Sequence, residues 1–181
     1  FICKSGQRSA LAAEFATAIA CHVLGVNPFD QPNVQGAKEA TAAVLAGKGG
    51  DPRTPALESV LATVRPGDYI AILAFLPRNP TIAARLSRVR HQLRDRYTVA
   101  TTLGFGPRFL HSTGQLHKGG PNTGVFIQVV DEPPHDRPVP GQPYTFGELE
   151  AAQAQGDLDA LRAHGRRVSR VGLEELERAF S

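Results

Sequence analysis

The apolar residues of this chain gather in short runs that are separated by longer segments of mixed composition. The run at 69–76 is nearly continuous and follows the turn Arg65-Pro66-Gly67-Asp68, which is typical of a strand buried on both faces. Runs at 97–103, 125–130 and 167–171 predict three further strands.

The segments between these runs carry the periodicity and the end signals of helices. Asn79 and Pro80 begin one helix, in which apolar residues recur at helical spacing to about Arg96 with five arginines on the remaining surface. Helices are also predicted at 9–24, 34–45, 56–64, 146–155, 158–164 and 173–180, and the Ala-rich first one is expected to be buried. Strands alternating with helices predict an α/β fold, a three-layer sandwich with a mostly parallel sheet, over a single domain of residues 1–181.

The composition narrows the classes of partner. With 41% hydrophobic and 20% charged residues, the chain is globular rather than disordered, and no apolar run is long enough to cross a membrane. The net charge of +3 fits an anionic metabolite. Lys and Arg are scattered and do not alternate with aromatic residues, so we expect no nucleic-acid partner.

The two cysteines and the first residues bear on location. Cys3 and Cys21 are expected to be free thiols in a reducing, cytoplasmic compartment. The opening Phe1-Ile2-Cys3-Lys4 has no charged n-region and no cleavage site of a signal peptide. Because it also lacks an initiator Met, we interpret it as a cut inside a longer protein.

The first segment with candidate chemistry is 27–38. Two prolines stiffen a loop that carries Asp30 and Gln31, and Lys38 lies in the helix that follows. A rigid loop before a helix start suits an anionic sugar phosphate. The Gln31 amide can bind sugar hydroxyls or phosphate oxygens, and the Lys38 ammonium can polarise or protonate a sugar oxygen. The alternative is a structural turn before an ordinary capped helix.

The second segment is the glycine-rich stretch 104–124, which is predicted to be a long loop after a strand. Its candidate ligand-binding residues are His111, Gln115 and Lys118, since glycines let backbone amides approach an anion and basic side chains supply charge. His111 and His117 are six residues apart with no nearby Cys or carboxylate, so we expect no metal site. A structural loop that only closes the site remains an alternative.

The segment 27–38 resembles the signature of the phosphoglucose isomerase family, which is Phe-Asp-Gln, any residue, Gly-Val-Glu, two residues and Lys. The chain matches this signature at Phe29, Asp30, Gln31, Val34 and Lys38, and departs from it at Asn33 and Gln35. Both departures, and the stretch 104–124, are similar to the branch of the family that is fused behind a transaldolase. The similarity extends to the C-terminus.

The resemblance implies a sugar-isomerase (SIS) type domain, forming the C-terminal part of a bifunctional transaldolase/glucose-6-phosphate isomerase. The implied reaction interconverts glucose 6-phosphate and fructose 6-phosphate without a metal or an organic cofactor. Lys38 would help to open the sugar ring, Gln31 would contact the substrate, and Glu14 would face this region. By the same resemblance, the base would lie in the N-terminal remainder of the enzyme, which is an implied partner together with a second copy in a homodimer.

Two other functions remain open from the sequence. The chain could be a non-catalytic, regulatory module that binds a sugar phosphate with the same fold. It could also be a structural or assembly domain without a ligand. For the arginine-rich helix 79–96, a solvated face and a docking surface for the rest of the enzyme are the two interpretations.

Overall fold

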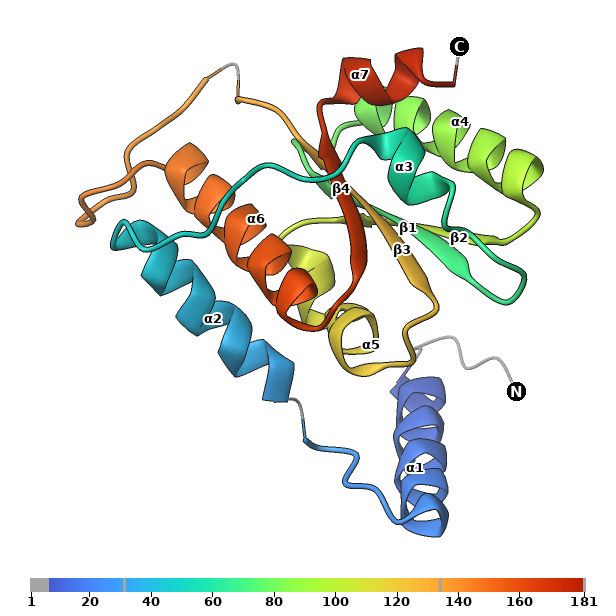
Figure 1. Ribbon diagram of the computed structural model, residues 1–181. Coiled ribbons are helices and arrows are strands. Elements are labelled where there is room, and N and C mark those ends of the chain that lie inside the picture. The colour runs from blue at the N-terminus through green and yellow to red at the C-terminus, as the bar shows by residue number, and fades with distance from the viewer. Residues whose placement is uncertain (1–6, 31, 134, 181) are drawn as a thin grey trace. The chain divides into compact units, whose positions relative to one another are not determined.

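The computed structural model describes residues 7–30, 32–133 and 135–180, apart from the side chains of 7–9 and 32–34. Although the sequence predicts a single domain, contacts divide the chain into two compact units, Phe1–Pro32 and Asn33–Ser181. Helix α1 (Gln7–Leu24) and the loop after it form the first unit. The second unit contains the four strands that the described residues form (Figure 1).

Helix α1 carries an apolar stripe that is exposed. Leu11, Phe15, Ile19 and Val23 recur every four residues and are 53%, 63%, 63% and 78% exposed. Side chains four residues apart lie on one face of a helix. We predicted a buried helix, but the described residues of its own unit give α1 nothing to pack against.

The second unit is built on a parallel sheet, as predicted. Strands β1 (Tyr69–Phe75), β2 (Ala100–Phe105), β3 (Gly124–Val130) and β4 (Arg167–Val171) lie in the order β2-β1-β3-β4. All three pairs are parallel, and Ile72 of β1 lies opposite both Leu103 and Ile127. Strand β1 is therefore central, which explains its nearly continuous apolar run.

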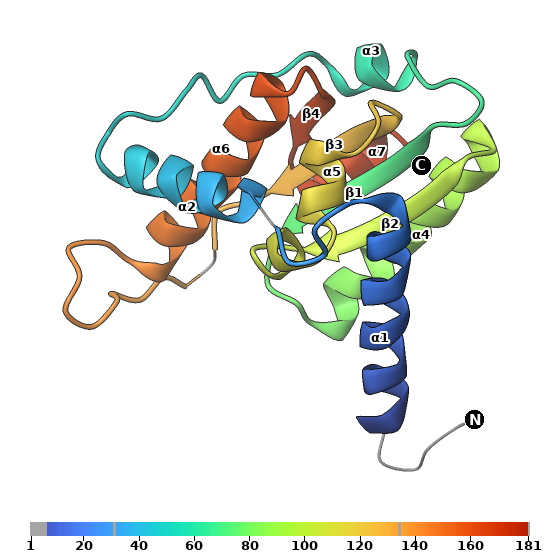
Figure 2. The same cartoon turned by 90° about the horizontal axis from the view of Figure 1, so that it is seen from below.

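Helices cover both faces of this sheet and complete a three-layer α/β sandwich (Figure 2). One face packs Ile70, Ile72 and Ala74 of β1 against α3 (Leu57–Leu61), α4 (Pro80–Tyr97) and α7 (Leu173–Arg178). The other face packs Ala71, Leu73 and Phe75 against α6 (Phe146–Ala163) and Phe109 of the 3-10 helix η1 (Arg108–His111). Alternate residues of one strand point to opposite faces, so β1 supplies both cores.

Residues at the helix ends fix where the helices begin and stop. As predicted, Asn79 caps α4: its side chain accepts a hydrogen bond from the amide of Ile82 at 2.9 Å. Thr145 and Glu148 form a capping box at the start of α6. At the far end of α4, Thr98 adopts a left-handed conformation with φ of 54°, which moves the start of β2 to Ala100 rather than the predicted residue 97.

Two further predictions about elements were wrong. The stretch 104–124 is not a continuous loop, because it folds into η1 and α5 (Gly114–Gly119), with Phe109 buried in the core. The helices predicted at 146–155 and 158–164 are the single helix α6, which runs through Gly156. Gly156 disfavours a helix locally, but packing against α2 (Pro32–Leu45) outweighs that preference.

A polar network inside the sheet joins β3, β4 and α6. Gln128 is fully buried, and its side-chain amide donates to the carbonyl of Ala154 at 2.9 Å. Arg170 donates to Gln128 Oε1 at 2.6 Å and to Gln155 Oε1 at 2.8 Å. Buried polar groups need such partners, so the network fixes how α6 lies on the sheet. No helix in the described part of the chain has the length and apolar character that a membrane span requires.

Candidate functional site

Lys38 and His111, two of the predicted site residues, line the same small cavity. Its other lining residues are Ala37, Thr41, Pro107, Leu110 and Gln153, which come from α2, the segment around η1, and α6. Lys38 and His111 are both exposed, so an ammonium and an imidazole are accessible at this opening. Together they can supply positive charge and a proton-transfer group to one ligand.

The size of this cavity limits what it holds by itself. Its volume is about 50 Å³, whereas ligand pockets usually have volumes of about 300–1,000 Å³. A water molecule takes about 30 Å³ of liquid volume, so the cavity accepts one small group. A phosphorylated sugar would have to lie across its mouth, with another surface enclosing the rest.

A close approach between α2 and α6 positions Lys38. A Cβ atom at Gly156 would lie 3.0 Å from the amide nitrogen of Thr41 and 3.1 Å from Cβ of Ala40. Thr41 also lines the Lys38 cavity. Helix α2 lies beside α6 in both ribbon views (Figures 1 and 2). Because residue 156 is a glycine and has no side chain, α2 can lie this close to α6, and the position of Lys38 depends on that approach.

Lys118 does not reach this cavity, which corrects its predicted place in a ligand-facing loop. Its Nζ lies 2.6 Å from Asp157 Oδ1, and the two side chains are 3% and 1% exposed. Because the stretch 104–124 folds into helix α5, Lys118 turns inward to α6. Burial raises the pKa of Asp157, and the nearby Lys118 ammonium opposes that rise.

Gln115 and His117 have different surroundings. Gln115 is half-buried on α5 and is not one of the residues that line the Lys38 cavity. His117 is 4% exposed and packs its ring against Tyr69, Phe109 and Phe126. Burial, with a smaller effect of Lys118, lowers the pKa of His117 to about 4, so its imidazole is neutral at pH 7. The described residues contain no group of three His, Cys, Asp or Glu arranged to hold a metal ion.

The proline-rich loop is only partly described. Gln31 lies outside the described residues, so its predicted approach to Lys38 stays a prediction. Asp30 is exposed, and the side chain of Asn27 accepts a hydrogen bond from the amide of Phe29 at 3.0 Å. Glu14, on α1, is exposed. Helix α2 begins at Pro32, two residues earlier than predicted.

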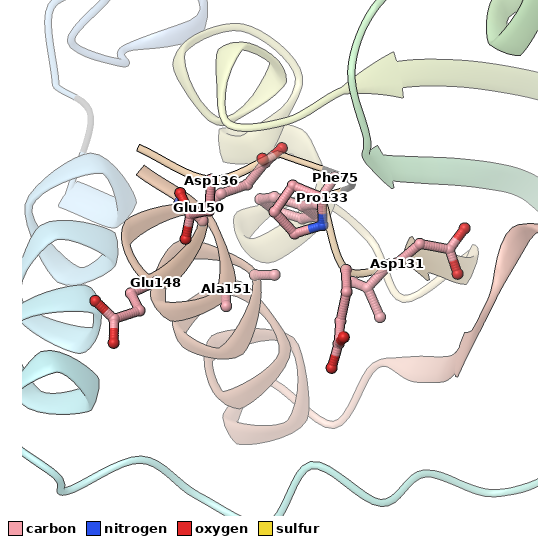
Figure 3. A pocket seen from close by; sticks show the side chains of 11 residues that line it. Phe75, Asp131, Pro133, Asp136, Glu148, Glu150 and Ala151 are labelled. Atoms are coloured by element: carbon pink, nitrogen blue, oxygen red, sulfur yellow. The ribbon is translucent and has the colours of Figure 1, made fainter. Parts of the chain in front are cut away.

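A larger cavity, of about 730 Å³, lies at the carboxyl ends of β1 and β3, where no site was predicted from the sequence. We call it the switch-point cavity, and it is lined by Phe75, Val130, Asp131, Glu132, Pro133, Asp136, Gly147, Glu148, Glu150, Ala151 and Ala154. Figure 3 shows these side chains around the first turns of α6. One signal was present in the sequence, because Asp131 and Glu132 directly follow the buried strand predicted at 125–130.

No protein-family model matches this sequence, and no curated protein matches it. Among solved structures, the chain is similar to one described as a hypothetical protein from Thermus thermophilus, with 18% sequence identity and a TM-score of 0.54. The match covers 79% of this chain and 39% of that chain, so the chain spans well under half of that protein's length. At this identity the likeness bears on fold alone, and the chain is an α/β protein with a three-layer arrangement around a parallel sheet.

Proposed function

We propose that this chain is the C-terminal part of a glucose-6-phosphate isomerase of the transaldolase-fused type, and that Lys38 belongs to its active site. One observation carries the proposal: Lys38 and His111, which are 73 residues apart in the sequence, line one accessible cavity. The signature resemblance around Lys38 supports the same assignment. Cytoplasmic location, a homodimer and independence of cofactors belong to this proposal as well.

The chemistry assigned to these residues is ring opening and charge neutralisation. The Lys38 ammonium donates a proton to the ring oxygen of the sugar, and His111 binds a hydroxyl or phosphate oxygen beside it. Gln31 and Gln115 remain the proposed further contacts. None of the described residues that line the Lys38 cavity is a carboxylate, so the base that moves the proton between C1 and C2 comes from the rest of the enzyme.

Two features support a site that another part of the enzyme completes. The Lys38 cavity is too small to enclose a hexose phosphate, and α1 presents an exposed apolar stripe. Exposed apolar area of this kind marks interaction surfaces. We assign the N-terminal remainder of the isomerase as the partner of that stripe.

A second candidate, a regulatory sugar-phosphate-binding module, is favoured by the lack of a carboxylate among the described residues that line the Lys38 cavity. The two candidates differ in turnover. The purified 181-residue chain should not convert fructose 6-phosphate on either account, whereas the full-length enzyme should do so only if it is an isomerase. Binding without turnover in the full-length protein would favour the regulatory module.

The residue test uses two exposed lysines of the same chain. In the full-length enzyme, Lys38→Ala should lower kcat by more than about tenfold, because a proton donor in the transition state is lost. Lys48→Ala is the matched control, since Lys48 is exposed and does not line the cavity. An unchanged kcat for Lys38→Ala, or an equal loss in both variants, would remove Lys38 from the mechanism.

A further inference from the structure

The switch-point cavity lies where the topology of the sheet reverses. From β1 the chain crosses through α4 to β2, and from β3 it crosses through α6 to β4, so the two connections leave in opposite directions. They also cover opposite faces of the sheet. In open α/β sheets, ligands bind in the crevice outside the carboxyl ends of the strands at such a point. Phe75 and Val130, the last residues of β1 and β3, both line this cavity.

The volume and the apolar wall are those of a binding site for a small organic molecule. The cavity measures about 730 Å³, within the usual range of about 300–1,000 Å³. Phe75, Val130, Pro133, Ala151 and Ala154 supply a hydrocarbon wall. A ligand with an apolar body gains from leaving water against such a wall.

The polar lining of the cavity is acidic. Its five carboxylates belong to Asp131, Glu132, Asp136, Glu148 and Glu150, and no Lys, Arg or His is among the described lining residues. In Figure 3, Asp131 and Glu148 lie on opposite sides of the view, with Asp136 and Glu150 between them. This lining repels a phosphate and attracts a cation.

Three of these carboxylates also make hydrogen bonds that stabilise the segments lining the cavity. Asp136 accepts a hydrogen bond from the amide of Gly147 at 2.8 Å, and Asp131 accepts one from the amide of Leu173 at 3.2 Å. Glu148 belongs to the capping box with Thr145. The hydrogen bonds to Asp136 keep its pKa below the usual value, so it stays ionised.

Glu150 differs from these three. Among the described residues it has no hydrogen-bond or ion-pair partner, and burial raises the pKa of its carboxyl group. A partly desolvated carboxylate without a partner gains from a cation placed against it. Since no three described carboxylates or imidazoles converge to hold a metal, an organic cation fits better than a metal ion.

We propose that the switch-point cavity binds a small organic cation, an amine or guanidinium on a short hydrocarbon body, with Glu150 as its principal charge partner. The hydrocarbon body packs on Phe75 and Val130, and the cationic head meets Glu150 and Asp136. This site is separate from the Lys38 cavity and prefers the opposite charge. The two sites share no described lining residue.

The probe is agmatine, which carries an amine and a guanidinium on a four-carbon chain. Titration into the full 181-residue chain, followed by amide NMR at moderate salt, should give saturable shifts centred on residues 130–151. Glu150→Gln should weaken binding by about tenfold or more, because it removes the charge partner without removing a structural hydrogen bond. Glu58→Gln, an exposed carboxylate on α3 outside the cavity, should leave the affinity unchanged.

Two further measurements test the roles of the hydrocarbon body and of the charge of Glu150. Guanidinium ion alone should bind more weakly than agmatine, because it lacks the hydrocarbon body. The affinity for agmatine should fall as the pH falls through the pKa of Glu150, since the protonated carboxyl loses its charge. Non-saturable shifts, equal affinity in Glu150→Gln and the parent, equal affinity for guanidinium and agmatine, or a preference for glucose 6-phosphate in this cavity would each overturn the proposal. The first three results leave the role of Lys38 untouched, whereas glucose 6-phosphate in this cavity would also count against the Lys38 site.

Discussion

Lys118 Nζ and Asp157 Oδ1 form an ion pair of 2.6 Å in the interior of the second unit, with both side chains almost fully buried. The pair links α5 to α6, and so fixes the segment after β2 onto the helix that leads to β4. Two opposite charges removed from water depend on each other, because either one alone would be uncompensated.

We expect Lys118→Met to lower the free energy of unfolding by about 3–5 kcal/mol, because it leaves the buried Asp157 carboxylate without its ion-pair partner. Urea denaturation measures the loss. The double variant Lys118→Met/Asp157→Leu should recover much of it, and Lys48→Met, at an exposed lysine, should change little. A stable single variant would show that the ion pair contributes nothing.

The stability of the second unit should fall between pH 6.5 and pH 4 because of His117. Its folded-state pKa of about 4 lies below the ordinary value of 6.5, so the unfolded chain binds the proton more tightly in this range. About 2.5 pH units at about 1.4 kcal/mol each give a loss of about 3.5 kcal/mol. Denaturation midpoints across this range should decline in the parent and stay flatter in His117→Phe, which keeps an aromatic ring. The same decline in both would exclude His117 as its cause.

Two glycine substitutions should have opposite effects on α2. Gly36→Ala meets nothing within 4 Å and should stabilise the helix by up to about 1 kcal/mol. Gly156→Ala places a methyl group 3.0 Å from the Thr41 amide nitrogen, and should push α2 away from α6. Hydrogen exchange of the α2 amides should therefore slow in Gly36→Ala and quicken in Gly156→Ala. Unchanged exchange in Gly156→Ala would mean that α2 tolerates the added methyl group.

Asn79→Ala should lower stability by about 1 kcal/mol, because the amide of Ile82 loses the oxygen that caps it. Thermal unfolding is a sufficient measurement. Thr81→Ala, at an exposed position of the same turn, is the matched control and should have a smaller effect. Equal effects in the two variants would argue against the cap.

The sheet was predictable because its two central strands, β1 and β3, are buried on both faces. Continuous apolar runs marked β1 and β3, and their pairing in parallel followed from the helices between them. The stretch 104–124 was harder to predict, because its many glycines suggested a loop. In the structure Phe109 is buried in the core, and the stretch folds into the short helices η1 and α5 around it. Gly156 led us to predict two helices in place of α6. The contact of this residue with α2 outweighs the low helix propensity of glycine, and a sequence pattern does not reveal such a contact.

The candidate site was predictable only in part. The sequence indicated Lys38 and His111 separately, and the fold brought α2, the segment around η1 and α6 together at one cavity. From the sequence, Lys118 looked equally able to bind an anionic ligand. Its actual partner, Asp157, lies 39 residues further along the chain, and no local pattern links the two residues. The switch-point cavity needs the strand order, which a single sequence does not supply.

The order β2-β1-β3-β4 also bears on how the sheet assembles as the chain is synthesised. Strand β1 emerges first and takes the centre, β2 joins one of its edges, β3 joins the other, and β4 adds outside β3. Each new strand thus meets a free edge that already exists, and none has to insert between two strands that are already paired. Growth from the middle outward lets this domain form on the ribosome without breaking earlier pairs.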